Sequence, residues 1–227
     1  MEIEYVGNEL ELFKNALNWK TYFSDKLMGH IHGDVLEVGS GICANTNFLQ
    51  NENVSSWTCL EPDNELIQKA ERVNNTSFIN GTLDDVDKDQ KFDTIIYIDV
   101  LEHIEKDSRE VINSYEFLKN GGKLIVLSPS YQYLFSPFDE SVGHFRRYNK
   151  NTISSLHPKC RPYRCFYLDS VGVILSLANK LILKSGSPTQ KQIKFWDSFV
   201  VQLSKFLDRL IGHSFGKSIV CIWKREE

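Results

Sequence analysis

This 227-residue chain lacks the sequence features that are typical of disulfide-rich, zinc-binding, membrane-spanning or secreted proteins. Its five cysteines are scattered and form no Cys-x-x-Cys pair, so neither a disulfide framework nor a zinc site is indicated. The longest apolar stretch, residues 171–183, is too short and too interrupted by polar residues to span a bilayer, and the N-terminus lacks a basic, apolar secretory signal. The sequence therefore predicts a cytoplasmic protein with reduced thiols.

Basic residues are scarce in the first part of the chain and concentrated later. Residues 1–140 contain 25 acidic and 11 basic side chains, whereas residues 141–196 contain 10 basic side chains and a single acid, Asp169. Such segregation informs about partners rather than about fold. Either the two stretches attract one another across the folded surface, or the basic one faces an anionic acceptor or an anionic membrane surface.

Apolar runs of strand length alternate with helical patterns, which is typical of a parallel sheet covered by helices on both faces. The expected strands are 34–38, 56–60, 76–79, 92–98, 123–127, 163–168 and 218–223. The expected helices are 64–73, 106–118 and 193–211, the last with one apolar face made by Trp196, Phe199, Val200, Leu203, Leu207 and Leu210. We expect a single domain over residues 1–227, with a helical, basic insertion at about 129–215 as a cap on the acceptor side.

A glycine-containing turn follows the first expected strand. In Val35-Leu-Glu-Val-Gly-Ser-Gly-Ile-Cys-Ala44 the glycines let the backbone approach a ligand, which the first N–H groups of a helix can face. Gly39-x-Gly41-x-x-Ala44 also satisfies the fingerprint of NAD-binding proteins, and Glu61 follows at the distance of a ribose-binding acid in either class. This turn alone leaves both kinds of cofactor open.

The later motifs favour one of the two. The first 130 or so residues resemble the class I S-adenosylmethionine-dependent methyltransferases, through Glu37-x-Gly39-x-Gly41, Leu60-Glu-Pro-Asp63, Gly81-Thr-Leu-Asp84, Phe92–Ile104 and Leu118–Leu127 in the family's order. The resemblance implies an α/β, Rossmann-like fold with a mostly parallel, seven-stranded sheet whose last strand is antiparallel, helices on both faces and extra C-terminal helices. It also implies S-adenosylmethionine as methyl donor and S-adenosylhomocysteine as product.

The resemblance assigns the contacts of the donor to the ends of the first strands. Glu61 is expected to accept both ribose hydroxyls with its two oxygens, a charge-assisted contact of the stronger kind. Thr82 stands where many relatives have an acid, and Cys43 where the usual third glycine stands. Gly39 and Gly41 are expected to leave room for the methionine part, and Glu37 is expected to fix the loop and to meet the ammonium of the donor. Pro62, Thr82, Leu83 and Asp84 are the expected contacts of the adenine.

Candidate catalytic groups follow the fourth expected strand. Asp99 ends that strand, where donor and acceptor are expected to meet, so it is a candidate for donor binding and catalysis. Asp99-x-x-Glu102-His103 looks like the metal-binding cluster of ubiquinone-pathway and small-RNA O-methyltransferases, which implies Mg²⁺ held by these residues. Leu-Glu-His-Ile also occurs in many relatives with no metal. We expect no metal and treat His103 as a candidate general base, with the ligand and structural roles left open.

A second constellation, Asp139–Tyr148, follows the fifth expected strand. It resembles the Gly-His-x-Arg-Arg-Tyr segment of methyltransferases often associated with polysaccharide and glycolipid assembly. The resemblance makes His144 a rival base, and Asn18-Trp19, on an expected N-terminal helix, fits the same subgroup as a lid over the donor. An Arg-Arg-Tyr turn can also tie a loop to the acidic half of the chain. The candidates for binding an anionic acceptor are His144, Arg146, Arg147 and Tyr148.

These observations predict O-methylation of a small-molecule, sugar or lipid-linked anionic acceptor, with peripheral membrane contact left open. An RNA- or protein-methylating enzyme and a donor-binding module without catalysis are the alternatives. Nucleic acid is the less favoured partner, because the basic run contains no recognised RNA-binding module. The oligomeric state is not indicated.

Overall fold

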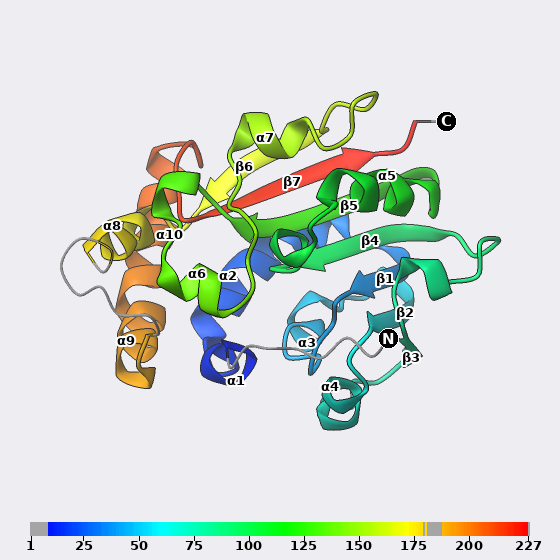
Figure 1. Cartoon of the computed structure of the whole chain (residues 1–227), viewed down its shortest axis with the longest axis horizontal. Coiled ribbons are helices and arrows are strands. Elements are labelled where there is room, and N and C mark those ends of the chain that lie inside the picture. Colours follow the sequence, from blue (N-terminus) through cyan, green and yellow to red (C-terminus); the bar gives the residue numbers. More distant parts are fainter. Residues whose placement is uncertain (1–8, 179, 181–187, 227) are drawn as a thin grey trace.

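A seven-stranded mixed sheet forms the centre of the computed structural model, which describes residues 9–178, 180 and 188–226 (Figure 1). Its strand order is β3-β2-β1-β4-β5-β7-β6, and β7 runs antiparallel to both of its neighbours. This confirms the predicted fold class. The strands are β1 (Gly33–Val38), β2 (Val54–Glu61), β3 (Thr76–Asn80), β4 (Phe92–Ile98), β5 (Leu118–Pro129), β6 (Arg164–Leu168) and β7 (Ser218–Lys224).

Helices cover both faces of the sheet because successive strand residues point to opposite sides. On one face, Ile125 of β5 joins the core formed with α2 (Leu17–Leu27), α9 (Gln190–Phe195) and α10 (Val201–Leu210). On the other, its neighbour Leu124 joins the core formed with α5 (Asp107–Glu116) and α7 (Lys150–Ser154). The near-continuous apolar strands of the sequence are therefore buried on two sides.

The other α-helices of the described residues have nine residues or fewer. They are α1 (Glu9–Phe13), α3 (Thr46–Leu49), α4 (Asn64–Lys69), α6 (Pro137–Ser141) and α8 (Ser170–Ala178). The helix expected at 64–73 ends early, because Ala70 is extended. The range 129–215 contains β6 as well as helices, so part of it belongs to the sheet. Residues 181–183 of the apolar stretch lie outside the described residues, among which no helix is long and apolar enough to cross a bilayer.

The apolar face expected for 193–211 is partly wrong. Trp196 and Val200 are buried, but Phe199, Leu203 and Leu210 are 61%, 41% and 68% exposed. One reason is that Trp196–Val200 forms a π-helical turn, η6, which changes the spacing between turns. The helix is continuous through α9, η6 and α10, as expected.

Three polar residues take the inward positions of this helix instead. Asp208 accepts hydrogen bonds from the Tyr22 hydroxyl at 2.7 Å and from the backbone N–H groups of 169 and 170. Asp197 accepts from the first backbone N–H groups of α2. Ser204 donates to Asp169 at 2.7 Å. Buried polar groups with full partners are tolerated in a core, so the apolar residues of the neighbouring stripe face outward.

Replacing Tyr22 by Phe is expected to lower the free energy of unfolding by about 1–2 kcal/mol, because it removes a buried hydrogen bond to a carboxylate. Asp208 keeps its two backbone donors in the variant. Urea denaturation measures the difference. A change below about 0.5 kcal/mol would show that this bond contributes no net stability.

Candidate functional site

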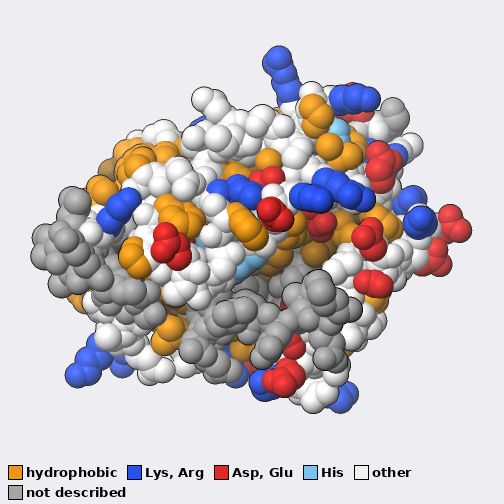
Figure 2. Space-filling view, viewed as in Figure 1, with side chains coloured by type: hydrophobic (Ala, Val, Ile, Leu, Met, Phe, Trp, Pro, Cys, Tyr) orange, Lys and Arg blue, Asp and Glu red, His pale blue; other side chains and the backbone are white. Residues whose placement is uncertain are grey.

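A large cavity of about 670 Å³ opens at the carboxyl ends of β1, β2 and β4. Parallel sheets of this kind bind ligands where the strand order reverses, here between β1 and β4. The volume lies within the range of about 300–1,000 Å³ that is usual for small-molecule sites. Figure 2 shows hydrophobic and histidine side chains at the bottom of a hollow near the centre of this face.

The turn after β1 keeps the cavity open because it carries little side-chain volume. Gly39 and Gly41 both line the cavity and have positive φ angles of 66° and 56°. A Cβ on Gly39 would lie 2.7 Å from a methyl carbon of Val100, so only glycine fits there. The sequence expectation of a close backbone approach at these two residues agrees with this geometry.

Glu61, at the end of β2, lines the same cavity and is held by the backbone. Its Oε2 accepts the N–H of Gly41 at 2.8 Å and its Oε1 accepts the N–H of Asp63 at 3.0 Å. Burial raises the pKa of this carboxyl, and these two hydrogen bonds oppose that shift. Each carboxylate oxygen retains a further acceptor site, so the group can take two more donors from a ligand.

The other residues expected at the donor end divide into two groups. Pro62, Thr82 and Leu83 line the cavity. Asp84 lies in a smaller hollow beside it, and Glu37 is not among the residues of the cavity wall. Glu37 is buried under the turn, where its Oε2 accepts hydrogen bonds from Thr46 and Trp57, and burial raises its pKa to about 7. Its position supports the loop-fixing role and not contact with a ligand.

The N-terminal helices close one side of the cavity. Trp19 lines it, whereas Asn18 points to Asp197 and donates to its carboxylate at 3.0 Å. Lys20, which the sequence reasoning missed, is buried in the wall, and burial lowers its pKa to about 8. Its ammonium donates to two backbone carbonyls, at Lys14 and Ala44. No motif marks this lysine, because its place depends on how α2 packs on the glycine turn.

His144, in the loop after α6, also lines the cavity and is oriented by a carboxylate. Its Nδ1 is 2.9 Å from Oδ1 of Asp139, which Arg147 also contacts with two N–H groups at 2.8 and 2.9 Å. Burial raises the pKa of Asp139, but the bonds from His144 and Arg147 outweigh it and bring the pKa below its ordinary range. Because an ionised Asp139 accepts at Nδ1, the Nε2 of His144 is the nitrogen available to a substrate.

Asp99, Glu102 and His103 lie next to His144. Asp99 is an exposed residue that lines the cavity. Desolvation by the surrounding protein raises the pKa of its carboxyl to about 6, and His144, Lys217 and Arg147 oppose this shift. Glu102 is fully buried, and burial followed by the nearby Asp99 raises its pKa well above the usual value. Burial lowers the pKa of His103 to about 4, so its imidazole is neutral at physiological pH.

The metal ligands suggested by the sequence are only partly brought together. Glu102, His103 and His144 each offer one ligand atom, and these atoms lie within 4.8 Å of one another. Asp99 is not in that group, and His144 takes its place. Neither oxygen of Glu102 has a hydrogen-bond partner among the described residues. One carboxylate oxygen and two imidazole nitrogens are a ligand set that suits a divalent cation.

Two of the four predicted acceptor-binding residues do not reach the cavity. Arg146 donates to the carbonyls of Ile104 and Glu105 and pairs with Asp107 at 2.8 Å. The buried Tyr148 hydroxyl donates to the same Asp107. Neither residue is part of the cavity wall, so the Arg-Arg-Tyr turn serves in part to fasten its loop to the acidic half of the chain.

Lys217, immediately before β7, is a second cation at this end that the sequence reasoning missed. It lines the cavity, its ammonium lies 4.9 Å from the centre of the Trp196 ring, and burial lowers its pKa. Nη1 of Arg147 is buried and has no hydrogen-bond partner among the described residues. The cavity therefore offers, besides the donor-side residues, the cations Arg147 and Lys217, the acids Asp99 and Glu102 and the oriented imidazole of His144.

Comparisons with known proteins agree with this architecture. Residues 36–124 match the family model described as a methyltransferase domain. A ubiquinone biosynthesis O-methyltransferase of Rickettsia bellii is 24% identical over 113 residues, which cover 46% of this chain and 47% of that protein. The nodulation protein S of Azorhizobium caulinodans is 38% identical over 109 residues, which cover 45% and 52%. The chain thus matches about half the length of these curated relatives.

Solved structures extend the likeness of fold to nearly the whole chain. A chain of the complex between the Haloferax volcanii Trm112 methyltransferase activator and a methyltransferase aligns with TM-score 0.65 and 11% identity, covering 97% of this chain and 95% of that one. The N-methyltransferase NodS of Bradyrhizobium japonicum in complex with S-adenosylhomocysteine aligns with TM-score 0.58 and 14% identity, covering 95% and 88%. Residues 36–124 thus match a methyltransferase domain in sequence, and the seven-stranded sheet of the whole chain shares the fold of these solved structures.

Proposed function

We propose that the chain transfers the methyl group of S-adenosylmethionine to a hydroxyl oxygen of a small anionic acceptor, with His144 as general base. The observation that carries this proposal is that one cavity contains both the Glu61 carboxylate beside the glycine turn and the His144 imidazole oriented by Asp139. A positioned base favours a hydroxyl acceptor, because a hydroxyl must lose its proton whereas a neutral amine attacks with its lone pair.

The donor is assigned to the end of the cavity near β1 and β2. Glu61 would accept the ribose hydroxyls with the lone pairs that Gly41 and Asp63 leave unused. Pro62, Thr82 and Leu83 line the wall on which the adenine would lie. Gly39 and Gly41 would admit the methionine part, and its sulfonium would approach Asp99 at the end of β4.

In the reaction, the acceptor oxygen attacks the methyl carbon in line with the breaking carbon–sulfur bond. The oxygen–carbon bond forms, the electron pair stays on sulfur, and S-adenosylhomocysteine leaves. Nε2 of His144 takes the hydroxyl proton, while Asp139 holds the ring and stabilises the imidazolium that results. The protein's main contribution is to align donor and acceptor and to exclude water.

The acceptor is proposed to carry a negative charge, as a small molecule, a sugar or a lipid-linked group. Arg147 and Lys217 line the cavity, and Nη1 of Arg147 is buried without a hydrogen-bond partner among the described residues. Leaving such a donor unpaired costs free energy, which an anionic ligand would recover. Arg146 and Tyr148 have no part in this proposal.

A second form of the same reaction would use a divalent cation. Glu102, His103 and His144 would hold the ion, which would supply the Lewis acidity that lowers the pKa of an acceptor hydroxyl. Dialysis against a chelator separates the two forms. Unchanged turnover after dialysis supports His144 as a base acting alone, and loss of turnover restored by Mg²⁺ or Zn²⁺ supports the cation.

The acceptor class is tested by supplying the protein with S-adenosylmethionine that carries a labelled methyl group, together with cell extract. The extract is then separated into lipid, saccharide, RNA and protein fractions. Label in the lipid or saccharide fraction, absent with a Glu61→Ala variant, supports the proposal. Label in the RNA or protein fraction would contradict the proposed acceptor class and assign an RNA or a protein as acceptor instead. If no fraction is labelled although the protein binds the donor, the chain would be a donor-binding module without catalysis.

Protonation of Asp99 is expected to weaken the binding of S-adenosylmethionine more than that of S-adenosylhomocysteine. The pKa of Asp99 is raised to about 6, so the carboxylate loses its charge as the pH falls through that value. Only the donor carries a sulfonium cation, and the lost attraction is worth about 1 kcal/mol or more, roughly fivefold in affinity. Calorimetry from about pH 5 to about pH 8, the window around that pKa, gives the ratio of the two affinities.

An Asp99→Asn variant is the control for this pH dependence. Its ratio of affinities should be flat with pH, which separates Asp99 from His144, Lys217 and Arg147 around it. A flat ratio in the unmodified protein would contradict the placement of the sulfonium near Asp99.

A further inference from the structure

The helix formed by α9, η6 and α10 has a second apolar face, which points away from the sheet. Phe195, Phe199, Leu203, Phe206 and Leu210 are spaced by four, four, three and four residues, and they are 55%, 61%, 41%, 62% and 68% exposed. We call these five residues the outer stripe. The rings of Phe195 and Phe199 stack with centres 5.7 Å apart. Contiguous exposed apolar side chains of this kind mark interaction sites.

Packing on the sheet does not account for the outer stripe. The inner face of the same helix buries Ile193, Trp196, Val200 and Val201 in the core, and its polar members are fully hydrogen-bonded. The helix is therefore anchored without the stripe. Figure 1 shows α8, α9 and α10 together at one end of the molecule. Ile174 of α8, which packs on α10, is also 65% exposed.

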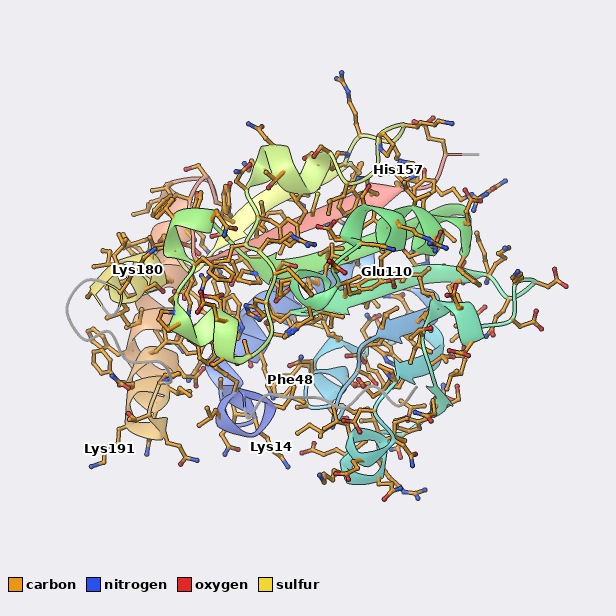
Figure 3. All side chains as sticks on the ribbon, viewed as in Figure 1. Lys14, Phe48, Glu110, His157, Lys180 and Lys191 are labelled. Atoms are coloured by element: carbon orange, nitrogen blue, oxygen red, sulfur yellow. The ribbon has the colours of Figure 1, made fainter. Side chains whose placement is uncertain are left out.

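The exposed charged side chains of residues 188–211 are all basic. The acids of residues 188–211, Asp197 and Asp208, are buried and face inward. Lys191, Lys194 and Arg209 are exposed, and Lys205 is half-buried. A polar residue immediately precedes each of the five members of the stripe and so runs alongside it: Lys194, Ser198, Gln202, Lys205 and Arg209. Figure 3 shows Lys191 pointing away from the body of the molecule at the end of α9.

We propose that the outer stripe docks the protein onto a bilayer surface that contains anionic lipids. Phenylalanine and leucine on one side of a helix with lysine and arginine beside them is the pattern of helices that lie in the membrane interface. The apolar rings enter the boundary between headgroups and acyl chains, and the cations meet the lipid phosphates. A second copy of the chain fits this face less well, since pairing two such faces brings basic side chains together.

Docking in this way also places the cavity close to the bilayer. Trp196, on the inner side of the helix that carries the stripe, lines the cavity. An acceptor carried on a lipid would then reach the cavity without leaving the membrane. This consequence rests on the proposed function, whereas the docking itself does not.

The test is co-sedimentation of the full chain with vesicles of phosphatidylcholine alone and of phosphatidylcholine mixed with phosphatidylglycerol. The protein is expected to bind the anionic vesicles at least about tenfold more tightly than the neutral ones, and less tightly at high salt. A double variant, Phe199→Ser with Phe206→Ser, should lose at least about tenfold of this binding. The matched control is Tyr163→Ser, because Tyr163 is 64% exposed but lies outside the stripe.

Three measurements keep the outcomes separate. The affinity for S-adenosylhomocysteine should be equal in the double variant and the unmodified protein, since neither phenylalanine lines the cavity. Equal, negligible binding to both kinds of vesicle would overturn the proposal. The proposal would also be overturned if the unmodified protein is a dimer that does not bind vesicles and the double variant is a monomer. The stripe would then be an interface between two copies of the chain. Vesicle binding without any affinity for S-adenosylhomocysteine would contradict the proposed function but would still support the docking surface.

Discussion

Replacing His144 by Ala is expected to lower the turnover number by about 10²- to 10⁴-fold, which is the usual contribution of a positioned general base. Asp139 orients the ring through Nδ1, so Nε2 is presented to the cavity as an acceptor of the proton. The affinity for S-adenosylhomocysteine should change little, because the contacts proposed for the donor come from Glu61 and the glycine turn and not from His144. Steady-state kinetics with calorimetry on the same preparation gives both values.

Two further histidine variants make this test specific. His103→Ala should cost less than His144→Ala, because the buried His103 has a pKa of about 4 and is a weak base. His157→Ala is the control for general effects, since His157 lies outside the cavity (Figure 3). A large loss in the His103 variant with normal turnover in the His144 variant would reverse the two assignments.

Replacing Glu61 by Ala is expected to weaken the binding of S-adenosylhomocysteine by about 100-fold or more. Two hydrogen bonds to an ionised carboxylate are together worth about 3 kcal/mol or more, and the acid also fixes the glycine turn through the N–H of Gly41. Calorimetric titration measures the loss. Turnover should fall with it, unlike in the His144 variant.

The control for Glu61 is Glu65→Gln, which removes an acid of the same type from the exposed surface of α4. Its affinity should remain that of the unmodified protein. A thermal melt of the Glu61 variant shows whether the domain remains folded. A folded Glu61→Ala protein with unchanged affinity would mean that the carboxylate has no part in donor binding.

The sheet was predictable because its strands are nearly continuous apolar runs, which only a doubly covered parallel sheet buries. All seven expected strands occur, and β7 is antiparallel as the resemblance implied. The exposed face of α10 was not predictable from spacing. Its inward positions belong to Ser204 and Asp208, whose partners Asp169 and Tyr22 lie far away in the sequence. Long-range hydrogen bonds overrule a local apolar pattern here.

The candidate site was predictable where it follows strand ends. The carboxyl ends of neighbouring parallel strands meet, so Gly39, Glu61 and Asp99 converge on one cavity. Lys20 and Lys217 belong to no recognisable motif. Lys20 reaches the cavity because α2 packs beside it, and Lys217 does so because it directly precedes the antiparallel strand β7. Asp139 lies within the segment Asp139–Tyr148 that the sequence singled out. Its hydrogen bond with His144 could not be predicted, because it depends on the fold of α6 and the loop after it.

The central claim is that the turn after β1 and the carboxylate at the end of β2 hold an adenosyl donor, and titration calorimetry with the unmodified protein tests it most directly. The account predicts that S-adenosylhomocysteine binds with a dissociation constant on the order of micromolar, about −8 kcal/mol, and that NAD gives no heat of binding at the same concentrations. Binding of NAD with none of S-adenosylhomocysteine would contradict it.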